Sequence, residues 1–234
     1  MIKKKFLALG ISAVAATAVV GAGFAGWTFT TEAGKSKNVG VRITAAYSFG
    51  SIEIATGAPD TLVLDQGDAA ADVTKGVYLA NGSAATTPVT ELSATWTVNS
   101  DSYTASAGKL TYVVNVYVNA ALSAYVNCGT KTAETTSAKT GYTQYSYAVT
   151  PATSDIVEDM GMNTTAVTIK QEISFNYVTG KKPQSFGDYK TMVNEIQGTA
   201  VGSVSEDTEY DVTTTETATD APVIIEFKVT KATS

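Results

Sequence analysis

The sequence contains no histidine, one cysteine and one arginine, and only 16% of its 234 residues are charged. Without histidine, the chain cannot form Ser-His-Asp or Cys-His nucleophilic sites, an HExxH zinc site or most transition-metal sites. With Arg42 as the only arginine, it has neither the guanidinium forks nor the basic stripe that phosphate recognition favours. We therefore expect a protein that does not bind nucleic acid.

The single cysteine excludes an intramolecular disulfide bond. Cys128 ends the apolar run that begins at Ala124. A chain of this length buries a core large enough to fold without disulfides, even outside the cell. We expect Cys128 to be a buried, small apolar residue. The alternative is a reactive thiol or a bridge to another molecule.

Carboxylates are the remaining groups with catalytic or metal-binding potential. The 22 acidic residues form no motif, and the spacing of carboxylates in a sequence does not identify a glycosidase pair. Two acidic segments, Asp155–Gly161 and Ser205–Asp211, contain potential oxygen ligands for calcium, but neither has EF-hand spacing. We expect both to be solvated loops. The sequence thus predicts no catalytic residue, no cofactor and no metal site.

The N-terminus has the pattern of a secretory signal. Three lysines at positions 3 to 5 precede an apolar stretch, Phe6–Val20, and small residues follow at Gly21–Gly26. Cleavage after Ala22 or Ala25 fits a signal peptidase, so residues 1–25 are interpreted as a signal peptide. The alternative is an uncleaved membrane anchor, which the richness in Ala and Gly disfavours. We expect a secreted protein, extracellular or at the cell surface, that meets the membrane only through its leader.

Beyond residue 38, apolar and polar residues alternate with a period of two, which is typical of half-buried antiparallel strands. The clearest segments are Leu92–Val98, Lys109–Asn119, Ala166–Tyr177 and Val223–Val229. Further strands are expected at Val39–Ser48, Ser51–Ala55, Val77–Leu79 and Tyr142–Thr150. Turns rich in Gly, Asn, Asp and Thr separate them. Residues 38–234 are therefore predicted to form one all-β domain, an antiparallel β-sandwich or jelly roll.

One or two short helices are expected within this domain. Phe186, Tyr189, Met192, Val193 and Ile196 follow a helical spacing. Ser185 is suited to be the N-cap of this helix and Gly198 to end it. A second helical turn is expected within Ala120–Val126.

The boundary between leader and domain carries a resemblance to a known family. Lys3–Lys5, the Ala- and Gly-rich core and the segment Val20–Phe29 resemble the leader of the TasA/camelysin family of exported matrix proteins of Gram-positive bacteria. The segment Val223–Thr230 is similar to the closing strand of that family. The resemblance implies a jelly-roll subunit of extracellular biofilm fibres. Its N-terminal extension, residues 26–37 here, would pair as a donor strand with the next subunit.

Physical chemistry permits this mode of assembly. The donor residues would be Trp27, Thr28, Phe29, Thr30 and Thr31, an alternating and β-prone segment. The leading hypothesis is a non-enzymatic surface or matrix protein that self-associates, with itself and other matrix or cell-surface components as partners. The alternatives are a secreted module that binds glycans or a host surface, and a secreted hydrolase that uses carboxylates.

Overall fold

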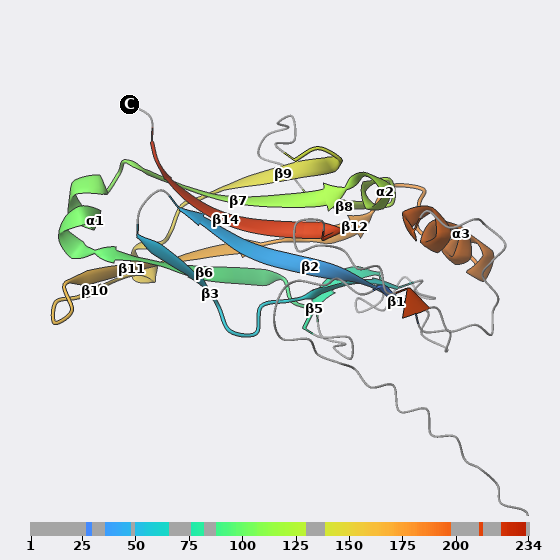
Figure 1. Ribbon diagram of the computed structural model, residues 1–234, viewed down its shortest axis with the longest axis horizontal. Coiled ribbons are helices and arrows are strands. Elements are labelled where there is room, and N and C mark those ends of the chain that lie inside the picture. Colours follow the sequence, from blue (N-terminus) through green and yellow to red (C-terminus); the bar gives the residue numbers. More distant parts are fainter. Residues whose placement is uncertain are drawn as a thin grey trace, which may run out of the picture.

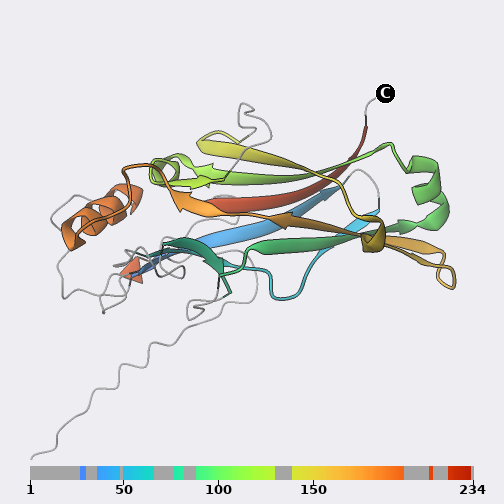
Figure 2. The same ribbon diagram turned by 180° about the vertical axis from the view of Figure 1, so that it is seen from behind.

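Two β-sheets lie face to face in the computed structural model (Figures 1 and 2). It describes residues 27–29, 36–47, 50–65, 76–81, 88–129, 139–197, 211–212 and 221–232. Among the residues expected at the leader boundary, Ala22, Ala25, Thr30 and Thr31 lie outside these ranges.

The larger sheet is built around the C-terminal strand. Its central strands are β2 (Ser36–Tyr47), β14 (Val223–Lys231), β7 (Leu110–Asn119) and β9 (Tyr142–Val149), in this order. The short strands β1 (Trp27–Phe29) and β13 (Asp211–Val212) continue the sheet beyond β2. In addition, β4 (Thr61–Asp65) pairs with β2, and β5 (Val77–Ala80) pairs with β4. The β2–β14 pair is parallel, whereas the other pairs of this sheet are antiparallel.

The second sheet is antiparallel and has four strands. In order, these are β10 (Ile156–Asp159), β11 (Thr164–Glu172), β6 (Glu91–Asn99) and β3 (Ser51–Ile54). A separate two-stranded sheet joins β8 (Val126–Cys128) to β12 (Phe175–Tyr177). Helix α1 (Ser100–Ser106) links β6 to β7, so the chain passes there from one large sheet to the other. The other helices are α2 (Ala120–Ser123) and α3 (Phe186–Gln197), and a 3-10 turn, η1 (Thr153–Asp155), precedes β10.

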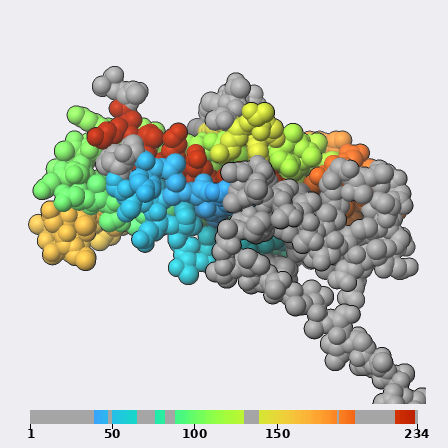
Figure 3. Space-filling model, in the orientation of Figure 1, coloured from blue at the N-terminus to red at the C-terminus, as the bar shows by residue number. Residues whose placement is uncertain are grey.

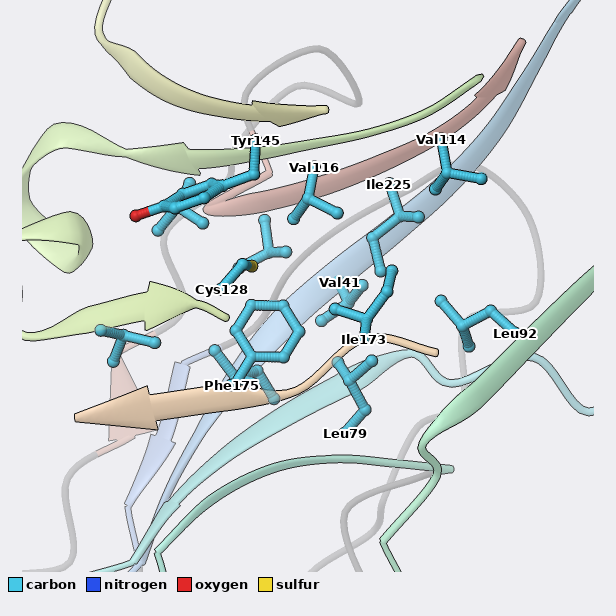
Figure 4. Close-up of a cluster of buried hydrophobic side chains, with 14 of the residues drawn as sticks. Val41, Leu79, Leu92, Val114, Val116, Cys128, Tyr145, Ile173, Phe175 and Ile225 are labelled. Carbon is cyan, nitrogen blue, oxygen red and sulfur yellow. The ribbon is translucent and has the colours of Figure 1, made fainter. Parts of the chain in front are cut away.

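The core fills the space between the sheets with the apolar residues of alternating strands. Val114 and Val116 of β7 and Ile225 of β14 point toward Leu92 of β6 and Ile173 (Figure 4). Trp96 of β6 is completely buried, and its ring lies 5.9 Å from the ring of Tyr103 and 6.3 Å from that of Tyr112, centroid to centroid. Apolar burial of this extent is the main force that stabilises the sandwich.

The predicted all-β sandwich with short helices is confirmed, with two corrections. The first is that the larger sheet is mixed, because β2 and β14 run parallel. The second concerns Ala166–Tyr177, which is not one strand: β11 pairs with β6, whereas β12 pairs with β8. Burial alternates without interruption from Val167 to Phe175, so periodicity does not reveal where the chain changes partners.

The predicted helices are also present. In α3, the Ser185 hydroxyl accepts a hydrogen bond from the Asp188 backbone N–H at 3.1 Å, as an N-cap does, while Gly198 lies outside the described residues. The second helical turn is α2. It ends at Ser123, and β8 begins shortly after it, at Val126. Helix α1 was not predicted, since none of its residues is buried and it has no apolar face.

A glycine between β2 and β3 fits closely against the buried tryptophan. Gly50 has a φ of +77°, and a Cβ placed there would lie 2.9 Å from Trp96 Nε1 and 2.9 Å from the Thr97 carbonyl oxygen. We expect Gly50→Ala to lower the free energy of unfolding by about 2–4 kcal/mol, from backbone strain plus overpacking. Gly108→Ala is the matched control, because Gly108 has nearly the same φ, +78°, with no atom within 4 Å. Equal losses of unfolding free energy for both variants, measured by urea unfolding, would contradict this account of Gly50.

Candidate assembly site

The N-terminal strand lies where the sequence places the start of the mature protein. Trp27, Thr28 and Phe29 form β1, which pairs antiparallel with β2 through Thr28–Asn38 and Phe29–Lys37. On its other edge, β1 pairs with β13 through Trp27–Val212 and Thr28–Asp211. Three of the five predicted donor residues thus adopt the extended conformation that strand exchange requires. The register with β2 is also defined.

Strand β2 extends the domain further toward the N-terminus than the sequence suggested. It begins at Ser36, so the last two residues of the expected extension, residues 26–37, already belong to a sheet strand. On one side it also carries β4, from Ser36–Asp65 to Gly40–Thr61. The β2 residues that pair with β1 also belong to the longer β2–β4 ladder. The position of β2 therefore does not depend on β1.

Other strand edges are open within the described residues. There, β3, β9 and β10 each carry a ladder on one edge only, with β6, β7 and β11 as the respective partners. An unpaired edge presents backbone N–H and C=O groups to which a strand of another chain can add.

A groove of about 160 Å³ runs along the seam between the sheets, beside β3. Apolar side chains from both sheets line it, among them Ile43 and Phe227 on one side and Ile54 and Leu92 on the other. The turn Ala55–Pro59 closes one end, and Glu91 supplies the only charged side chain of the lining. The groove joins residues too distant along the chain to predict from the sequence.

The acidic segments do not form a metal site in the part of the chain that is described. No group of three or more His, Cys, Asp or Glu side chains converges there. In Asp155–Gly161, Asp155 pairs with Lys170 at 3.1 Å, and the Asp159 carboxylate accepts hydrogen bonds from the backbone N–H groups of Gly161 and Met162. These carboxylates shape a hairpin. Of Ser205–Asp211, only Asp211 is described.

The tyrosines of β9, together with Tyr117 of β7, pack into the sandwich rather than forming an exposed face. Tyr145 and Tyr147 are buried in the core, and Tyr117 is buried on the opposite face of the larger sheet, against Ala221 and Ile224. The hydroxyl of Tyr142 donates to the Ala221 carbonyl at 2.8 Å. These side chains therefore contribute to packing within the sandwich.

Cys128 is fully buried, as predicted, and points into the core beside Tyr145 and Phe175 (Figure 4). Burial raises the pKa of its thiol well above the ordinary value, and the nearby Tyr147 opposes this only in part. Burial also raises the pKa of Tyr112 to about 12. For Tyr125, burial and a hydrogen bond to the Glu195 carboxylate raise the pKa to about 12.

These shifts predict a loss of stability in alkaline solution. In the unfolded chain the thiol and the phenols titrate at their ordinary pKa values of 9.0 and 10.0, whereas in the folded chain they keep their protons to higher pH. These groups therefore make their full contribution to the free energy of unfolding below pH 9. The contribution falls as the pH rises, by up to about 1.4 kcal/mol per pH unit for Cys128. The half-buried tyrosines contribute less, because solvent screens them.

Urea unfolding between about pH 8 and about pH 11 measures this slope. Cys128→Ala is expected to flatten it between about pH 9 and about pH 11, at the cost of a lower stability at neutral pH. A thiol reagent is expected to label Cys128 only after unfolding. Rapid labelling of the native chain would contradict the burial of this thiol.

Among the described residues, no helix is long and apolar enough to cross a membrane. Comparison of the chain with protein-family models, with curated proteins and with solved structures gave no match.

Proposed function

We propose that this chain is an exported, non-enzymatic structural subunit that assembles into extracellular fibres by exchanging its N-terminal strand. In the assembled state, Trp27–Phe29 of one copy would occupy, on the next copy, the place beside β2 that it occupies in a single chain. The observation that carries the proposal is the position of β1. This strand is three residues long and pairs with β2 at two positions only, and it follows the predicted cleavage region by a few residues.

Free-energy considerations favour exchange of β1 between copies over its permanent pairing within one chain. A ladder this short contributes little, and strands near a chain terminus open at low cost. Exchange of an identical element between copies preserves the contacts of the single chain, so the driving force comes from contacts that only the assembly makes. Because donor and acceptor are different surfaces, a head-to-tail series of exchanges does not close and grows as a filament.

The expected location follows from the same segment. We propose that the leader, residues 1–25, directs export and is removed after Ala22 or Ala25, which frees β1 to exchange outside the cell. The partners are further copies of this chain, together with other matrix or cell-surface components. A glycan-binding module would need a patch of exposed aromatic rings. Tyr47 is the one strongly exposed large aromatic residue among those whose side chains the structure describes, so no observation favours that function.

Production of the chain from Gly26 onward tests the proposal. We expect polymers in the void volume of a size-exclusion column and filaments in negative-stain electron microscopy, with a β-type circular dichroism spectrum. Filament mass should increase with protein concentration, because each exchange joins two molecules. A chain that stays monomeric at every concentration, with its N-terminus intact by mass spectrometry, would contradict the proposed function.

A further inference from the structure

Exposed apolar side chains gather on one hairpin of the sandwich. Strands β10 and β11 are joined by a tight turn through Asn163, which has a φ of +53°. In this hairpin Met160 is 83% exposed, Met162 75% and Val157 60%. They are three of the four strongly exposed large apolar residues in the described part of the chain. Clustering of exposed apolar residues on a projecting element is typical of a contact surface.

The hairpin tip is also acidic and well ordered by its own hydrogen bonds. Glu158 and Asp159 are both exposed beside the methionines. The Asp159 carboxylate accepts hydrogen bonds from the Gly161 and Met162 backbone N–H groups at 2.9 and 3.1 Å, which holds the turn in shape. The tip therefore presents two flexible thioethers next to negative charge, on a preformed scaffold.

A second surface feature, a pocket lined partly by β5 and β12, contains a lysine, whereas the hairpin tip is acidic. Its volume is about 390 Å³, and its lining includes Val77 of β5 and Phe175 and Tyr177 of β12. Lys182 lines the pocket as well, and the neighbouring Lys181 places its ammonium 5.3 Å from the centre of the Tyr125 ring. The Tyr177 ring suits methionine side chains, since sulfur makes favourable contacts with aromatic rings.

The hairpin lies at one end of the long axis, and the strands that line this pocket lie in the other half. Figures 1 and 2 both place the β10–β11 hairpin at one end, near α1, and β12 toward the end that carries α3. In the space-filling view, the hairpin protrudes as the amber group of atoms at one end (Figure 3). A head-to-tail arrangement of two copies would therefore bring the acidic, apolar tip of one toward the lysine-containing pocket of the next.

We infer that the β10–β11 hairpin docks into the β5–β12 pocket of a second copy of this chain. Met160 and Met162 enter against Val77 and Tyr177, while Glu158 and Asp159 face Lys181 and Lys182. The contact joins unlike surfaces, so it links copies head to tail, by itself into short oligomers that depend on concentration. It is separate from strand exchange: it uses neither β1 nor β2, and it persists when the N-terminal strand is altered.

The first test measures self-association in a chain from Gly26 whose Trp27–Phe29 segment is replaced by Gly-Ser-Gly. Analytical ultracentrifugation is expected to show oligomers that increase with concentration and weaken at high salt. Met160→Ser with Met162→Ser should lower the association constant about 10-fold or more, since it removes two buried side chains from the contact. Tyr47→Ser, which removes another strongly exposed large side chain elsewhere, should leave it unchanged.

Charge exchange tests the orientation of the contact. Glu158→Lys and Lys182→Glu should each weaken association roughly 2- to 5-fold, and the double variant should restore it. In a Met162→Cys/Asn176→Cys variant, mild oxidation should give a ladder of covalent oligomers on a non-reducing gel, whereas either single variant gives none beyond a dimer. Asn176 is exposed and lines the pocket.

The outcomes separate the two proposals. Association that survives the Gly-Ser-Gly replacement and fails in the methionine double variant supports the hairpin contact, even if filaments depend on β1. A Gly-Ser-Gly chain that is monomeric at all concentrations overturns the hairpin contact and leaves strand exchange standing. Equal association of the methionine double variant and its parent, or absence of the covalent ladder, also overturns it.

Discussion

Replacement of Trp27–Phe29 by Gly-Ser-Gly is expected to abolish filaments made by the chain from Gly26. The replacement keeps the length of the N-terminal segment but removes its β-prone side chains, and glycine loses more conformational freedom than other residues when it joins a sheet. Short end-to-end oligomers should remain, whereas long filaments in negative-stain micrographs should disappear. The effect is close to all-or-none, because each link in a strand-exchanged series requires this segment.

The Gly-Ser-Gly replacement should leave the fold unchanged. Strand β2 keeps its ladders with β4 and β14, so the circular dichroism spectrum and the midpoint of urea unfolding should move little. A chain that begins at Lys35 serves as a second control, since it lacks β1 and retains all of β2. Filaments of normal length from either variant would refute strand exchange.

Trp96→Ala is expected to lower the free energy of unfolding by about 3–5 kcal/mol, the largest stability effect of any single substitution named here. The side chain is fully buried in β6, between the two sheets, and contacts the rings of Tyr103 and Tyr112. Its removal leaves a cavity that a sandwich pinned by β11 and β3 on either side cannot close. Urea unfolding followed by circular dichroism measures the loss.

The neighbouring residue provides the control for this substitution. Thr97 belongs to the same strand and has the same ladder partners on both sides, but its side chain is only partly buried. Thr97→Ala should cost no more than about 1 kcal/mol, mainly through lower β-propensity. Similar losses for Trp96→Ala and Thr97→Ala would show that the core is not organised around the tryptophan.

Alternation in the sequence was sufficient to locate the strands that have one buried and one solvated face. Leu92, Ala94, Trp96 and Val98 are all buried in β6, as their period of two predicts. The pattern failed where burial does not alternate. In β4, Leu62, Val63 and Leu64 are buried in succession, so this strand was missed. In β10 only Ile156 is partly buried, and its mostly polar sequence gave no signal.

The surfaces that carry the proposals were predictable to different degrees. The N-terminal segment could be found because it is continuous in sequence and combines β-propensity with a position directly after the leader. The hairpin tip could not, since an exposed methionine and a core methionine look the same in a sequence. The pocket joins Val77 to Phe175 and Lys182. Such proximity depends on sheet topology, which periodicity does not contain.

A disulfide between β1 and β2 tests strand exchange most directly. Thr28 and Asn38 are partners in the β1–β2 ladder, close enough for cysteines at both positions to form a bond. In the Thr28→Cys/Asn38→Cys variant, oxidised after assembly, we predict a ladder of covalent oligomers on a non-reducing denaturing gel, because each bond joins two copies. A single band of monomer with an internal disulfide, obtained from preparations that contain filaments, would contradict the account.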